Sequence, residues 1–175
     1  RGFGMKNEHL IPDILEWTQD ADEIARLSRR KEELYRELLR EKGIDPLPGV
    51  VPFLERLRAA GVTCIIASST SRANISCALE VTHIADDFDG IVSGEDTEKG
   101  KPHPEPFLAA AEQTGTDPAD CVVFEDAHVG VEAGRRAGMK VVGVASTHDP
   151  DSLKDADRVV VRLDELEGTD PNQWF

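Results

Sequence analysis

The chain has 175 residues and is 39% hydrophobic, which suffices for one packed domain and is too much for a disordered chain. Its 34 acidic residues outnumber its 20 basic residues and give a formal net charge of -14, so we expect no nucleic-acid partner. A small phosphorylated ligand is still compatible with this charge, because it needs only a local group of hydrogen-bond donors. No apolar run approaches the roughly 20 residues that a membrane helix requires, so we expect no membrane partner.

The three cysteines, Cys64, Cys77 and Cys121, are an odd number without paired spacing. Cys64 and Cys121 lie inside apolar runs, so we expect both to be buried free thiols in a reducing compartment. With no signal-peptide pattern in these residues, the sequence favours a cytoplasmic protein, which we expect to be a monomer.

The first elements in chain order are helical. Apolar residues at three-to-four spacing predict a helix over residues 8–42, in which the charged run 29–33 forms a solvated face. A Pro- and Gly-rich segment, 43–49, follows and marks the expected domain boundary. Residues 1–44 are therefore one expected domain, and residues 45–175 are the other.

Beyond this boundary, short apolar strands alternate with amphipathic helices. The alternation predicts an α/β fold with a parallel sheet that helices cover on both faces. Glycines 130, 134 and 138 share one face of the last helix, which indicates close packing there. The expected strands are 62–67, 90–92, 121–124, 141–144 and 159–161, and the expected helices are 50–60, one beginning at 75–79, 104–113 and 127–137.

Polar residues follow the strands at the points where ligands bind in open parallel sheets, beyond the carboxyl ends. Ser68, Ser69 and Thr70 follow the first strand and precede a helix, where hydroxyl and free N–H groups suit an anion. The alternative for these three residues is an ordinary helix N-cap. Lys101 stands in the rigid turn Gly-Lys-Pro-His-Pro and suits a phosphate as a compact positive charge. The alternative for Lys101 is a solvated loop lysine.

Two acidic residues, Glu125 and Asp126, end the third strand and open a helix. Carboxylates at the end of a strand suit a hard cation such as Mg²⁺, so we expect magnesium as the cofactor. The alternative is that Asp126 only caps the helix. The histidines at 103, 128 and 148 lack zinc-like spacing, so we expect no transition-metal site.

Three segments in this order resemble the haloacid dehalogenase (HAD) superfamily, in its phosphatase and β-phosphoglucomutase-like branch. They are ASST at 67–70, GKPHPEPF at 100–107 and VFEDAHVGVEAGRRAGM at 123–139. The resemblance implies a Rossmann-like core with a helical cap over residues 1–44, hinged near Gly4 and at 43–49.

The same resemblance implies roles for individual residues. The Ser68 hydroxyl and the backbone N–H of Ser69 would hold the transferring phosphoryl group, and Lys101 would neutralise the charge that develops around it. Asp126, with Glu125 beside it, would position Mg²⁺. Ser68 and Lys101 are thus the expected catalytic residues.

The family's first motif, a DxDG-type strand end with the aspartate nucleophile, is expected before the cap, yet the sequence begins within the cap. The pair Asp20 and Asp22 follows no apolar strand and lacks the glycine. We therefore expect an N-terminally truncated relative, or as the alternative a degenerate relative without this motif. In both cases the sheet lacks its central strand, and we expect the 175-residue chain alone to be inactive. An organellar address upstream of Arg1 is an alternative to the cytoplasm.

The substrate expectation rests on the cap. Mutases of this branch resemble one another in having an arginine where this chain has Asn7, so a phosphatase of a small phosphorylated metabolite is favoured. The segments GMKNE, ARLSRRKEELY and RLDEL resemble plant-type riboflavin-pathway phosphatases that act on ribitylaminouracil phosphate. Lys6 and Asn7 are then the cap residues expected to meet the substrate. A phosphosugar mutase and a non-catalytic phosphate-binding relative are the alternatives.

Overall fold

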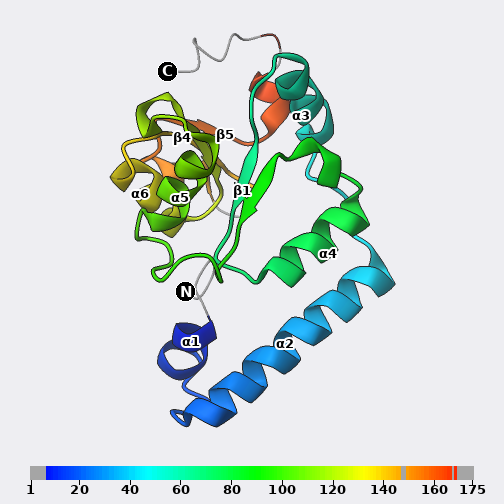
Figure 1. Cartoon of the computed structure of the whole chain (residues 1–175), viewed down its shortest axis with the longest axis vertical. Helices are drawn as coiled ribbons and strands as arrows, with labels where there is room; N and C mark the ends of the chain where they lie inside the picture. Colours follow the sequence, from blue (N-terminus) through cyan, green and yellow to red (C-terminus); the bar gives the residue numbers. More distant parts are fainter. Residues whose placement is uncertain (1–6, 147–148, 167, 169–175) are drawn as a thin grey trace.

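The computed structural model describes residues 7–146, 149–166 and 168 (Figure 1). The helical elements are α1 (Asn7–His9), η1 (Leu10–Ile14), α2 (Ala21–Lys42), α3 (Val50–Ala59), α4 (Arg72–Thr82), η2 (Ala85–Asp87), α5 (Glu105–Thr114), η3 (Pro118–Asp120), α6 (His128–Arg136), η4 (Pro150–Leu153) and η5 (Leu163–Leu166). The strands are β1 (Ile65–Ala67), β2 (Gly90–Val92), β3 (Val122–Glu125), β4 (Lys140–Val144) and β5 (Arg158–Val160).

The strands form two parallel ladders. One pairs β1 with β2, and the other runs in the order β3-β4-β5. Each consecutive pair of strands is joined by a connection that contains a helical element, as parallel strands require. The expected α/β fold with parallel strands is confirmed. In the described part of the chain the strands form two separate ladders, which agrees with the expectation from the family resemblance that the sheet lacks its central strand.

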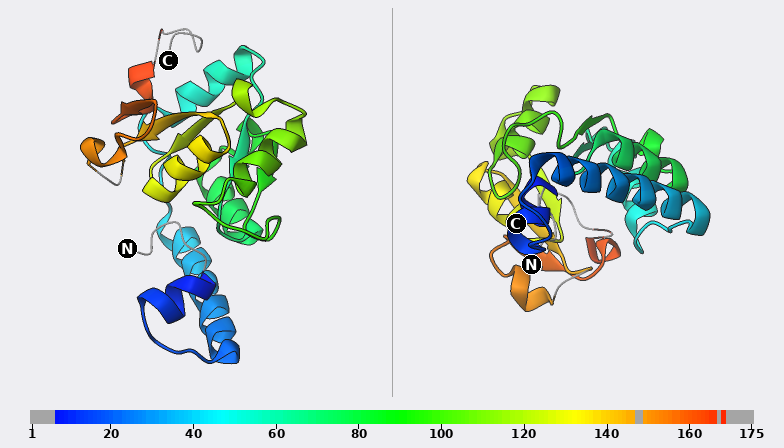
Figure 2. Two further views of the ribbon diagram at one scale, coloured as in Figure 1. Left: turned by 90° about the vertical axis from the view of Figure 1, so that its left-hand side faces the viewer. Right: turned by 90° about the horizontal axis from the view of Figure 1, so that it is seen from below.

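The core lies on both faces of the second ladder. Val141 and Val142 are consecutive residues of β4, so their side chains point to opposite faces of the ladder. Both are fully buried, which means that both faces are covered. Val141 packs in a cluster with Val131 of α6, and Val142 packs in a cluster with Phe53 of α3. Figure 2 shows α6 and α3 on opposite sides of this ladder. Helices therefore cover both faces, as the apolar strand pattern predicts.

The predicted helix over residues 8–42 is wrong in its middle. Helical structure stops after η1 and resumes at α2, which Asp20 caps by accepting a hydrogen bond from the Glu23 backbone N–H at 2.9 Å. Between them Glu16 has a φ of 54°, a left-handed value that no α-helix contains. Pro12, which has no N–H to donate, lies just before the break. The periodicity of the apolar residues continues across this break, so it conceals the cap.

The expectation that Cys64 and Cys121 are free thiols is confirmed, but the expectation that they are buried is wrong for both. All are free, but only Cys77 in α4 is buried, whereas Cys64 and Cys121 are half-buried. Cys64 precedes β1, because that strand begins at Ile65 rather than at residue 62. Partial burial still raises the pKa of the Cys64 and Cys121 thiols, with nearby aspartates adding to the effect.

The other expected strands and helices lie within a few residues of the observed ones. Two of the three glycines pack closely: a Cβ at Gly130 or Gly134 would collide with Glu125 or Val141. Gly138 instead lies beyond the end of α6 with a φ of 77°. Among the described residues, no helix combines the length and the apolar character that crossing a membrane requires.

Candidate functional site

A cavity of about 650 Å³ lies between the carboxyl ends of the strands and the helices α1 and α2. Figure 1 shows α1 and α2 together below the sheets, with α2 running beside α4. Six of the seven site residues predicted from the sequence line this cavity: Asn7, Ser68, Ser69, Lys101, Glu125 and Asp126. The seventh, Lys6, lies outside the described residues, as does Gly4.

The loop after β1, residues 68–70, is held in a compact form. The Thr70 backbone N–H donates to Ser68 Oγ at 3.3 Å, and the Gly94 backbone N–H donates to the Thr70 carbonyl at 2.8 Å. A Cβ at Gly94 would lie 2.4 Å from the Ser69 carbonyl oxygen, so only glycine allows this approach. We call residues 68–70 the anion loop, because their hydroxyl and N–H groups are of the kind that binds anions.

The helix-cap alternative for the anion loop is wrong. The N-cap of α4 is Ser71, whose side chain accepts from the Asn74 backbone N–H. Ser69 Oγ is buried and has no hydrogen-bond partner among the described residues, which leaves a polar atom for a ligand to satisfy.

Lys101 is held at the back of the cavity and joins the two ladders. Its Nζ donates to the Ala67 carbonyl at the end of β1, at 3.0 Å, and forms an ion pair with Glu125 at the end of β3. The Nζ atom also lies 4.6 Å from the centre of the Phe107 ring. The Lys101 side chain is only 9% exposed, so the alternative of a solvated loop lysine is wrong.

Glu125 is committed to contacts within the chain. One carboxylate oxygen pairs with Lys101, and the other accepts from the Ala127 backbone N–H at 3.4 Å. Gly130 leaves the space that the carboxylate occupies against α6. The N-cap of α6 is Ala127, so the alternative in which Asp126 caps this helix is wrong.

The described residues contain no group of three or more His, Cys, Asp or Glu side chains that could hold a metal ion. Mg²⁺, however, usually keeps several waters and takes one or two protein carboxylates plus substrate phosphate oxygens. Asp126 lines the same cavity as the anion loop and can supply such a carboxylate. The residues present therefore fit a magnesium ion that shares its ligands with a phosphate, and metal binding by Glu125 and Asp126 stays a prediction.

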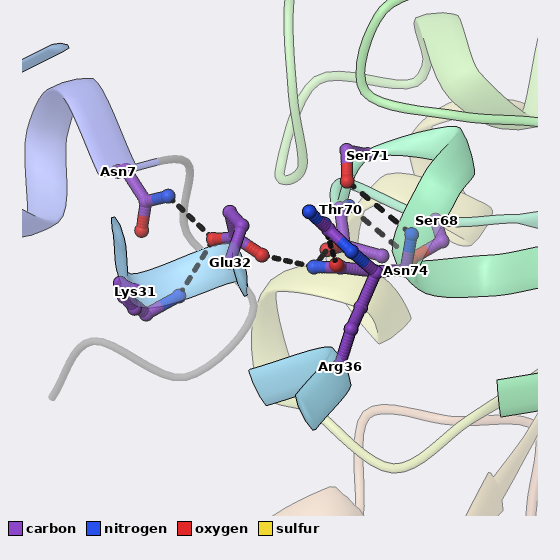
Figure 3. Close-up of polar contacts among 8 residues, drawn as sticks. All are labelled: Asn7, Lys31, Glu32, Arg36, Ser68, Thr70, Ser71 and Asn74. Atoms are coloured by element: carbon purple, nitrogen blue, oxygen red, sulfur yellow. Dashed lines mark hydrogen bonds and ion pairs between the residues drawn. The ribbon is translucent and has the colours of Figure 1, made fainter. Parts of the chain in front are cut away.

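The cavity wall formed by the helices contains residues that the sequence did not single out. Glu32 of α2 receives hydrogen bonds from Asn7 Nδ2 at 2.6 Å, from Lys31 Nζ at 2.9 Å and from Asn74 Nδ2 of α4 (Figure 3). Its side chain is 16% exposed, so the predicted solvated face over 29–33 is wrong at this residue. No signal in the sequence distinguishes Glu32 from its neighbour Glu33.

The pair Asp20 and Asp22, rejected as a nucleophile motif in the sequence, does not line the cavity. Asp20 is the N-cap of α2. The chain also contains Asp-Phe-Asp-Gly at 87–90, but this segment precedes β2, where Asp89 accepts a hydrogen bond from the Cys64 backbone N–H at 2.8 Å. Residues before a strand lie at the end of the parallel ladder opposite to the cavity.

Comparison with known proteins agrees with this arrangement. The family model of the haloacid dehalogenase-like hydrolases matches residues 3–138, and the chain belongs to this family. It is 36% identical over 164 residues to the chloroplastic 5-amino-6-(5-phospho-D-ribitylamino)uracil phosphatase of Arabidopsis thaliana, covering 93% of this chain and 43% of that protein. It is 31% identical over 118 residues to validoxylamine A 7'-phosphate phosphatase of Streptomyces hygroscopicus subsp. limoneus, covering 67% of this chain and 55% of that protein.

Among solved structures, β-phosphoglucomutase of Clostridium difficile is similar, with a TM-score of 0.83 and 29% identity over 94% of this chain and 76% of that one. The chain thus spans about half the length of the two curated relatives, at 43% and 55%. The resemblance to the phosphatase and phosphoglucomutase-like branch, including the plant-type riboflavin-pathway phosphatases, is confirmed.

Proposed function

We propose that the whole protein is a magnesium-dependent phosphatase that hydrolyses a small phosphorylated metabolite. The observation that carries the proposal is the convergence of Ser68, Lys101 and Asp126 on one cavity, although they come from three separate segments. Phosphoryl transfer asks mainly for positioning and for positive charge around the phosphoryl oxygens. The anion loop supplies hydrogen-bond donors, Lys101 supplies the charge, and Asp126 would hold a Mg²⁺ ion that neutralises phosphate charge when bound.

The covalent nucleophile in this proposal is an aspartate outside the 175 residues. Its carboxylate attacks phosphorus and displaces the alcohol oxygen of the substrate, which takes up a proton as it leaves. Water then cleaves the acyl phosphate, which restores the carboxylate and releases inorganic phosphate. Residues 1–44 act as the cap, with the hinge at 43–49, and Asn7 together with Lys6 meets the substrate.

The narrower substrate proposal is ribitylaminouracil phosphate, supported by the likeness to the Arabidopsis phosphatase. The competing proposal, a phosphosugar mutase, has support from the likeness to β-phosphoglucomutase, whereas Asn7 in place of the mutase arginine disfavours it. A mutase would isomerise a sugar phosphate in the presence of a bisphosphate and release little phosphate. A non-catalytic relative would bind phosphate without either reaction.

The test is phosphate release by the protein expressed from its complete gene, with Lys101→Met and Lys99→Met as a matched pair. Lys99 stands two residues away and is exposed, so it controls for loss of one positive charge. We expect Mg²⁺-dependent release that Lys101→Met reduces by at least about 100-fold and Lys99→Met leaves unchanged. Equal activity of the two variants would contradict the role of Lys101.

We further propose a monomer in a reducing compartment, either the cytoplasm or the chloroplast. The three free cysteines support the reducing environment, and the Arabidopsis relative is chloroplastic.

A further inference from the structure

The buried side chain of Asn74 connects helix α2 to the anion loop. Asn74 is only 3% exposed, yet its amide oxygen and its amide nitrogen both have hydrogen-bond partners, one of them positively charged and the other negatively charged (Figure 3). Arg36 Nη1 donates to Asn74 Oδ1 at 2.8 Å, and Asn74 Nδ2 donates to the Glu32 carboxylate. A guanidinium can only donate and a carboxylate can only accept, so these two residues fix the orientation of the amide.

This orientation decides which way the Thr70 hydroxyl donates. Asn74 Nδ2 also donates to Thr70 Oγ1, at 2.9 Å. Because the hydroxyl oxygen accepts at this contact, its own hydrogen has to point to another acceptor. Thr70 lines the cavity with Ser68, so a ligand oxygen there can take this hydrogen bond. A reversed amide would present Oδ1 to Thr70 and take the hydrogen away from the cavity.

Both carboxylate oxygens of Glu32 accept hydrogen bonds, which holds the side chain in place for its contact with Asn74. Oε1 accepts from Asn7 and Lys31, while Oε2 accepts from Asn74. Glu32 and Arg36 are four residues apart, so both face α4 from the same side of α2. Partial burial alone would raise the pKa of Glu32, but the hydrogen bonds from Lys31, Asn7 and Asn74 outweigh this effect, and the net result is a lowered pKa. The side chain is therefore an ionised acceptor at neutral pH.

We propose that Glu32 is a positioning residue for the anion loop, which acts through Asn74 to direct the Thr70 hydroxyl toward a phosphate oxygen in the cavity. The inference rests on the proposed function, because it takes the ligand of the anion loop to be a phosphate group. It assigns Thr70 as an oriented donor beside Ser68. It also makes the position of helix α2 a condition for strong anion binding.

The test is a double-mutant cycle on the dissociation constant for inorganic phosphate, measured by calorimetric titration of the full 175-residue chain with Mg²⁺ present. Thr70→Val removes the hydroxyl at nearly constant volume and should weaken binding about fivefold, the usual value of one such hydrogen bond. Glu32→Ala should weaken binding two- to fivefold. In binding free energy this is about half of the Thr70→Val effect or more. In the Thr70→Val background, Glu32→Ala should have no further effect.

Two controls separate positioning from charge and from folding. Glu33→Ala removes the same charge from the exposed neighbouring position, and should leave binding unchanged or slightly stronger, because an anion is repelled by carboxylates. Thr70→Ser keeps the hydroxyl and should bind as the unaltered chain does. If Thr70→Val does not fold, Asn74→Ala gives the same cycle, because it removes the amide through which Glu32 acts on Thr70.

The possible results bear on the positioning role of Glu32 and on phosphate binding by the anion loop. If Glu32→Ala binds phosphate as well as the unaltered chain or more tightly, or if its effect multiplies with that of Thr70→Val, the positioning role is overturned. If the unaltered chain binds no phosphate, or binds it equally well after Ser68→Ala, this inference fails, whereas the proposed function of the whole protein is decided separately by phosphate release from the protein expressed from its complete gene. Loss of binding in Ser68→Ala together with a non-additive cycle supports both.

Discussion

Replacing Gly130 with alanine tests how closely α6 packs on the carboxylate of Glu125. A Cβ at this position would lie 2.0 Å from Glu125 Cδ and 2.3 Å from each carboxylate oxygen. Ordinary contacts begin at 3.4 Å, so the carboxylate has to move away from α6. We expect this movement to disturb the ion pair of Glu125 with Lys101, because both side chains are only 9% exposed and have little room to adjust.

The expected magnitude follows from two opposing effects. Breaking a buried ion pair costs about 3–5 kcal/mol, because it leaves buried charge without a partner. Alanine is a better helix former than glycine by about 1 kcal/mol. The net prediction is a loss of about 2–4 kcal/mol in the free energy of unfolding, whereas helix propensity alone predicts a gain.

The assay is urea unfolding of the 175-residue chain followed by far-ultraviolet circular dichroism, with the unaltered chain and Gly130→Ala side by side. The same substitution is then made in a Glu125→Ala background, where the new Cβ meets no carboxylate and should stabilise by up to about 1 kcal/mol. A Gly130→Ala chain as stable as the unaltered one would refute the reasoning. An equal loss in the Glu125→Ala background would show that the clash with Glu125 is not its cause.

Three further predictions concern other parts of the chain. Asp20→Ala should destabilise by about 1 kcal/mol through loss of the α2 N-cap, and Asp22→Ala should not, as urea unfolding will show. Because the pKa of Glu32 is lowered in the folded chain, its contribution to stability should be present above its ordinary value of 4.5 and lost as the pH falls through the folded value. The difference in unfolding free energy between the unaltered chain and Glu32→Gln should therefore shrink in acid; a constant difference would contradict this. The 175-residue chain alone should release no more phosphate from a substrate than its Lys101→Met variant does, and EDTA-sensitive release above that level would count against it.

The ends of the strands could be predicted from the sequence because the signals there are local. A run of apolar residues followed by Ser68, or by Glu125 and Asp126, identifies a buried strand and the residues just beyond it. Parallel pairing then places these residues at one edge without further information. The same local signals placed Lys101 in a rigid turn, but its burial depends on Glu125, which is 24 residues away.

The wall of the cavity formed by helices could not be predicted, because its contacts join distant parts of the chain. Glu32 and Asn74 are 42 residues apart. Each lies among other polar or charged residues, so neither stands out in the sequence. The periodicity of α2 says which residues share a face, but it does not say that this face meets α4. The break before Asp20 was hidden for a related reason, since one capping carboxylate among many acidic residues gives no distinct signal.

The position of Lys101 between the ladders makes its amine a reporter on their docking. Its Nζ contacts the end of β1 and the end of β3, which belong to different ladders. Any separation of the two ladders would expose this amine to solvent, whereas lysines on the surface are exposed throughout. The rate at which Lys101 is acylated by an amine-directed reagent, compared with Lys99, therefore measures how often the two halves of the molecule part.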